Sequence, residues 1–402
     1  TPRQVTHRRM PDRYLGRSPE NKENLLVLAR AYERLSEATY FLGETLVPVY
    51  SAFRGLNLAE GAGPSPETAR SAAAVGALLG FIPMHGIARG YLDRAQAMAY
   101  DFDNLESREF VSMTSSYYYC GVGDWDNVQK QSGQVLALAD RLGDKRRWQD
   151  VTSHLTSMRY FRGEFASSAE LADELHKVAS YRQDSRFMAL ALQDMAHHAL
   201  YAGKLDDATR HLSTLRALIG EGSEVSVIPL KMELLGLTAL VHLQQGEYNE
   251  ALKAAQQSLD LTVKANPSFY AAITGYTAPA EVYLTLWESQ PASTEFAQQA
   301  KLSVRTLGKY ARVFPIGQPR LLRYQGWLHW LNGKKDPAHR SWQTGLHHAE
   351  QLGMIYDQGI LHYEIARHLS SDDPSHSDHI AQAIRLLERS HAAYDLERAQ
   401  AI

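Results

Sequence analysis

The sequence has 402 residues, of which 44% are hydrophobic and 22% charged, as in folded globular proteins. Its formal net charge of −3 excludes the overall basic character of nucleic-acid-binding proteins, so we expect no nucleic-acid partner. The single cysteine, Cys120, excludes intrachain disulfides and Cys-based zinc sites and is typical of a reducing compartment.

The sequence also gives no sign of a membrane or export segment. The most apolar run, residues 72–84, is too short to cross a bilayer and is interrupted by Gly76, Gly80 and Pro83. No signal peptide is visible at the start. We therefore expect a cytoplasmic protein. Because residue 1 is Thr, we expect the sequence to be a piece of a longer protein.

Residues 1–22 are a basic, proline-containing lead-in, with six Lys and Arg residues against Asp12 and Glu20. Binding of nucleic acid or an acidic partner is one reading of this stretch, but a linker or the remnant of a preceding repeat is favoured. The run Ser18-Pro-Glu-Asn21 is predicted to open the first helix. We therefore predict a lead-in over 1–22 and one helical repeat domain over 23–402.

Residues 31–99 contain the most distinctive motifs. In order they are Ala31-Tyr32, Gly55-Leu-Asn-Leu-Ala-Glu60, Gly63-Pro-Ser-Pro-Glu67 and Phe81-Ile-Pro-Met-His85. In the third block Ser65 is a candidate N-cap and Pro66 the first helical residue.

The order of these blocks resembles the tetratricopeptide-like C-terminal region of bacterial class III adenylate/guanylate cyclases that carry an AAA/STAND-type ATPase module. The motif-bearing part covers about 70 residues, and the rest resembles that family only in repeat rhythm. The resemblance implies a regulatory helical region and an ATPase or cyclase module in cis as partner. In that family the nucleotide chemistry belongs to segments that precede the repeats, so no activity is implied for this chain.

A turn pattern recurs along the rest of the chain: Gly, a large apolar residue two positions later, and a small residue five positions later. The pattern begins at Gly123, Gly203 and Gly246 and, in weaker form, at Gly163 and Gly333. The intervals are 40, 40, 43 and 87 residues, the last being two units with a degenerate turn at 287–292. Extrapolation places further turns near Gly43, Gly80 and 371–374. A repeat of about 40 residues indicates stacked helical hairpins.

Residues 234–261 are the clearest unit. Leu234, Leu237, Leu240 and Val241 lie at helical spacing before Gly246, and the following helix carries a one-sided stripe. That stripe consists of Tyr248, Ala251, Leu252, Ala255 and Leu259. The chain is then predicted to end in one capping helix over 380–396. No segment alternates with period two. We predict an all-α, right-handed superhelical solenoid of about nine hairpins.

The sequence offers little chemistry. The Gly-Lys pairs at 203, 308 and 333 lack the preceding glycine of a phosphate-binding loop. The histidine pairs 197/198, 347/348 and 376/379 lack a third ligand in sequence, so we predict no metal. Cys120, beside three tyrosines, is interpreted as a buried structural thiol. The aromatic residues 117–119, 327, 330 and 342 are assigned to the core rather than to a ligand groove.

We therefore predict a non-catalytic binding scaffold without cofactor, whose concave surface binds a protein segment or small effector. Two alternatives are an independent effector-binding regulator and an enzyme that uses the superhelix groove. No catalytic, cofactor-binding, metal or partner-binding residue is assigned from the sequence.

Overall fold

A computed structural model describes residues 4, 7, 21–41, 46–102, 104–220 and 228–402. The fold is all-α, and no strand occurs in these ranges. The chain divides into two compact units, one comprising residues 1–119 and 125–151 and the other residues 120–124 and 152–402. The predicted boundary after residue 22 stays a prediction.

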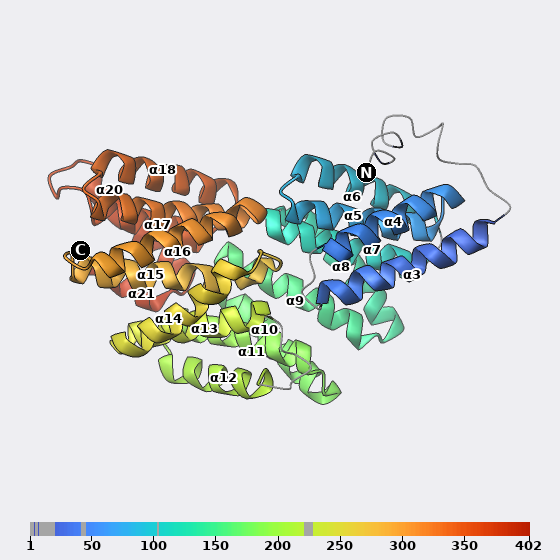
Figure 1. Cartoon of the computed structure of the whole chain (residues 1–402). Coiled ribbons are helices and arrows are strands. Elements are labelled where there is room, and N and C mark those ends of the chain that lie inside the picture. Colours follow the sequence, from blue (N-terminus) through green and yellow to red (C-terminus); the bar gives the residue numbers. More distant parts are fainter. Residues whose placement is uncertain (1–3, 5–6, 8–20, 42–45, 103, 221–227) are drawn as a thin grey trace. The chain divides into compact units, whose positions relative to one another are not determined.

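The described residues form 19 α-helices, which follow one another as antiparallel neighbours (Figure 1). The helices up to the junction of the two units are α3 (Lys22–Phe41), α4 (Leu46–Ala62), α5 (Pro66–Phe81), α6 (His85–Asp101), α7 (Leu105–Val122), α8 (Trp125–Leu142) and α9 (Lys145–Arg162). The helices after it are α10 (Phe165–Arg182), α11 (Ser185–Tyr201), α12 (Leu205–Leu218), α13 (Ile228–Gln244), α14 (Tyr248–Lys264), α15 (Ile273–Ser289), α16 (Thr294–Val313), α17 (Gln318–Leu331), α18 (Lys335–Gln351), α19 (Ile355–Ala366), α20 (His376–Arg389) and α21 (Ala393–Gln400). Two 3-10 turns precede α15 and α17, η1 (Tyr270–Ala272) and η2 (Pro315–Gly317).

The predicted turn pattern marks real hairpins. The five glycines at 123, 163, 203, 246 and 333 all have positive φ, between 70° and 76°. This left-handed conformation suits glycine because it has no Cβ. The apolar residue two positions later begins the next helix at Trp125, Phe165, Leu205 and Tyr248. The pairs from α3/α4 to α19/α20 therefore give the predicted nine hairpins in the described chain, and α21 follows them.

Other predicted boundaries have mixed outcomes. Ser65 caps α5 by accepting from the Thr68 backbone N–H, and Pro66 begins the helix, as predicted. The turns near Gly80, 287–292 and 371–374 fall between helices. Gly43 and the helix start at 18–20 lie outside the described residues.

Two predictions about individual elements are wrong. Tyr248 does not continue the apolar stripe of α14, because it begins that helix and is 53% exposed. The predicted final helix over 380–396 is two helices, because His391 has φ of 58° and interrupts the helix between α20 and α21.

In the first unit, a buried carboxylate links α4 to α6 and to residues near the start. Glu60 accepts hydrogen bonds from Arg94 Nη1 at 2.7 Å and Gln4 Nε2 at 2.6 Å, and it lies 2.5 Å from His7 Nδ1. Gln4 also accepts from Tyr91 Oη at 2.8 Å. Of the predicted lead-in, Gln4 and His7 are thus buried partners of the helical unit.

In the second unit α11, α15 and α19 belong to an inner layer. Most residues of α11, α15 and α19 are buried, whereas α12, α14 and α18 bury a single face. Helices α13 and α15 approach so closely that a Cβ added at Gly236 would lie 2.6 Å from the Thr274 carbonyl oxygen.

In this unit, residues that are far apart in the sequence also contact one another. A Cβ at Gly163, in the α9/α10 turn, would lie 2.6 Å from the backbone nitrogen of Tyr356 in α19. The Tyr201 ring of α11 lies 4.8 Å from the Tyr356 ring, and α11 contacts α21. In the described ranges, no helix combines the length and apolar character needed to cross a membrane.

Candidate functional site

The inner layer of the second unit is polar as well as aromatic. Arg320 of α17 is 6% exposed; its Nε donates to Asp357 Oδ1 at 2.9 Å and its Nη1 to Tyr160 Oη at 3.1 Å. These bonds join α9, α17 and α19 across the interior. Removing one side chain of such a buried ion pair leaves an uncompensated buried charge, which is strongly destabilising.

A second buried cluster lies around α11. His197 Nε2 is 2.8 Å from Thr274 Oγ1 and 3.3 Å from Glu233 Oε2. Glu233 also accepts a hydrogen bond from the Gly275 backbone N–H at 3.0 Å. Burial, with the charge of Glu233 as a second cause, raises the pKa of Asp194 to about 8.

These contacts bear on the predicted concave surface. At Tyr160, Arg320 and Asp357 the inner faces of the helices bind one another. Side chains that are already buried and paired do not offer a surface to a partner. The predicted concave wall is therefore closed at these residues.

Residues singled out in the sequence are scattered through the structure. Cys120 is fully buried, and burial raises the pKa of its thiol to about 12, as expected of a structural thiol. Tyr118, Tyr119, Trp327 and Trp342 are core residues, as predicted, whereas Tyr117 and Trp330 are only partly buried.

The histidine pairs do not converge. His198 is buried beside the Phe165 ring, and burial lowers its pKa to about 3. His347 lies beside Gln351, and His379 faces His362 with 2.8 Å between their Nδ1 atoms. Within the described part of the chain, no three His, Cys, Asp or Glu side chains gather as a metal ion would require.

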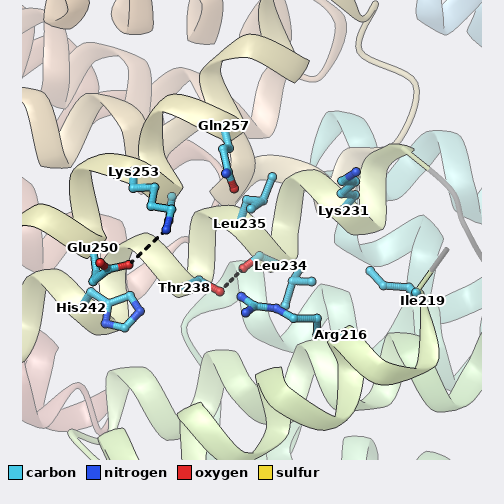
Figure 2. Close-up of a pocket in the computed structure, with 12 residues that line it drawn as sticks. Arg216, Ile219, Lys231, Leu234, Leu235, Thr238, His242, Glu250, Lys253 and Gln257 are labelled. Atoms are coloured by element: carbon cyan, nitrogen blue, oxygen red, sulfur yellow. Dashed lines mark hydrogen bonds and ion pairs between the residues drawn. The ribbon is translucent and has the colours of Figure 1, made fainter.

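A groove of about 420 Å³ lies on the second unit between α12, α13 and α14 (Figure 2). Its floor consists of Leu234 and Leu235 of α13 and Ala254 of α14. Thr238 also lines it, but the Thr238 hydroxyl donates to the Leu234 carbonyl at 2.7 Å. Because that donor is satisfied within the helix, the floor behaves as an apolar surface.

Three cations line this groove, one from each helix: Arg216 of α12, Lys231 of α13 and Lys253 of α14. Lys253 Nζ lies 3.9 Å from Glu250 Oε2 in an exposed pair. Neither Arg216 nor Lys231 forms an ion pair with any residue that the structure describes. The groove therefore joins a leucine floor to an excess of positive charge.

The groove follows one stripe of α13. Lys231, Leu234, Thr238 and His242 lie at i, i+3, i+7 and i+11, which is one face of a helix. The opposite side of α13 is buried through Met232, Glu233 and Gly236. A rigid helix thus fixes the floor, while two amphipathic helices supply the walls.

The sequence pattern did not predict this site. Leu234 was placed among the apolar residues at helical spacing before Gly246, and it is 5% exposed. The available signal was the set of polar residues at 231, 238 and 242 on one side of a leucine-rich helix.

Comparison with protein-family models and with curated proteins gives no match. Among solved structures, the chain is similar to a Rap protein complexed with competence and sporulation factor. The TM-score is 0.61 at 10% sequence identity, over 94% of this chain and 97% of that chain. It is also similar to a human IFIT1 dimer with m7Gppp-AAAA, with a TM-score of 0.50 at 11% identity over 96% of this chain and 85% of that chain. At these identities the likeness concerns the fold alone, a tetratricopeptide-like helical solenoid, and neither match provides a link to cyclases.

Proposed function

We propose that this chain is a regulatory binding scaffold that recognises a protein segment in the groove between α12, α13 and α14. The observation that carries the proposal is the combination of an aliphatic floor with cationic walls in a chain of net charge −3. An apolar floor contributes affinity by removing nonpolar surface from water, and charged walls favour one class of partner over others.

Two kinds of regulatory protein are compatible with this proposal. The blocks between residues 31 and 99 support a regulatory region that passes partner occupancy to an ATPase or cyclase module. The fold likeness to a Rap protein complexed with a factor supports a second candidate, an independent peptide-binding regulator. Both assign the same task to the groove. In both, the chain acts by binding and not by catalysis.

A blocking variant tests the proposal. Gln257 of α14 is exposed and points toward Leu235 (Figure 2), so Gln257→Trp places an indole over the groove floor. Asn249→Trp adds the same side chain to an exposed position of the same helix that does not line the groove.

The experiment is selection of a displayed random-peptide library on the whole chain. We expect recovered peptides to bind the wild type and Asn249→Trp equally, and Gln257→Trp at least about tenfold more weakly. If no peptide is recovered, or if Gln257→Trp binds the recovered peptides as well as the wild type, the groove is not the recognition site.

A further inference from the structure

Resting on the proposed function, we infer that the partner of this groove is an acidic protein segment. Its aliphatic residues lie on Leu234 and Leu235, and its acidic end lies toward Lys231.

The charges of the groove differ between its two ends. At the His242 end, the polar groups already have partners: Lys253 pairs with Glu250, and His242 Nδ1 lies 2.6 Å from Glu247 Oε2. At the other end, Lys231 meets no carboxylate among the described residues. Figure 2 shows Lys231 at the opposite end of the groove from His242 and Glu250.

This asymmetry selects the orientation of the partner. A carboxylate placed near Lys231 meets a cation without competing with an existing pair. A carboxylate at the other end meets Glu250 and must displace it from Lys253. Like charges brought together at an interface disfavour the wrong partner and the wrong register.

The length of the segment follows from helix geometry. Positions 231 and 242 are eleven residues apart on α13, which corresponds to about 16 Å at a rise of 1.5 Å per residue. An extended chain advances about 3.3 Å per residue, so about five extended residues span the groove. The leucine floor lies between these two ends and therefore receives the middle of the segment.

A synthetic array tests this inference with peptides of that length, acetylated and amidated so that only side chains carry charge. The central residues are leucines, and one end carries two Asp, two Asn or two Lys residues. Dissociation constants are measured by fluorescence anisotropy for the wild type, Lys231→Glu and Lys264→Glu. Lys264 is an exposed cation of α14 that does not line the groove, so its reversal changes the net charge of the chain equally.

We expect the Asp peptide to bind the wild type about tenfold more tightly than the Asn peptide. Lys231→Glu should remove this preference and improve binding of the Lys peptide, whereas Lys264→Glu should leave the preference within about twofold. Equal binding of the Asp and Asn peptides, equal effects of the two reversals, or no binding by any array peptide overturns the acidic-segment inference. The library selection with Gln257→Trp tests the proposed function separately. If that selection returns uncharged peptides that Gln257→Trp binds weakly, the groove is the recognition site but the acidic-segment inference is wrong.

Discussion

Replacing Gly236 by Ala tests the closest helix contact of the second unit. The new Cβ would lie 2.6 Å from the Thr274 carbonyl oxygen and 2.9 Å from the Gly275 nitrogen. These are backbone atoms, so no side-chain rotation relieves the clash and α13 must move away from α15. Overpacking costs about 1–3 kcal/mol. The movement also strains the Gly275 N–H bond to buried Glu233, and a hydrogen bond to a charged group contributes about 1.5–3 kcal/mol.

Against these costs, Ala has a higher helix propensity than Gly by about 1 kcal/mol. We expect Gly236→Ala to lower the free energy of unfolding by about 2–4 kcal/mol. The control is Gly308→Ala in α16, where the new Cβ meets only Leu321 at 3.9 Å. That change should be neutral or stabilising by up to about 1 kcal/mol. Urea unfolding followed by circular dichroism compares the two variants. Equal midpoints would refute the close approach of α13 and α15.

Two further changes test burial in the same unit. Asp194 has its pKa raised to about 8, so the folded protein holds a proton that the unfolded chain releases near pH 4, and the wild type should lose stability as pH rises from 4 to 8. Asp194→Asn cannot lose this proton, so the urea midpoint of the variant should rise relative to that of the wild type between pH 5 and pH 8. A difference in midpoint that does not change with pH would contradict the burial of an ionisable carboxyl. Ala251→Trp should destabilise the chain by about 3 kcal/mol or more, because Ala251 is fully buried. Glu250→Ala changes an exposed residue of the same helix and should alter the stability by no more than about 0.5 kcal/mol. Similar urea midpoints for the two variants would show that the buried face of α14 is misassigned.

The hairpin architecture was predictable because a local rule produces it. Five hairpin turns contain a glycine in the left-handed region, and four of these glycines recur at intervals of 40 to 43 residues, at 123, 163, 203 and 246. Such a local rule does not decide burial. Tyr248 has the spacing of a core residue but is exposed, whereas Trp125 and Phe165, which begin their helices at the same position of the turn pattern, are buried.

The groove and the inner layer were not predictable by the same means. Arg320 and Asp357 are charged residues that a pattern assigns to solvent, and only the three-dimensional structure brings them together across 37 positions. Likewise, Leu234 serves both as a core residue and as the floor of a groove. Periodicity shows that a side of α13 is apolar but does not show that α12 and α14 leave part of it uncovered.

The contact between the Gly163 turn and Tyr356 has a consequence for how the second unit folds. Helical repeat arrays generally unfold from their ends, because each repeat touches only its immediate neighbours. Here a turn near the beginning of the unit meets a helix near its end, and closing so long a loop costs conformational entropy before any contact is gained. Folding of this unit should accordingly be slower than that of a linear array with the same helices, and its terminal hairpins should not fray independently. Loss of α19 would remove the surface against which α9 and α11 pack, so damage at one end of the unit is transmitted to the other.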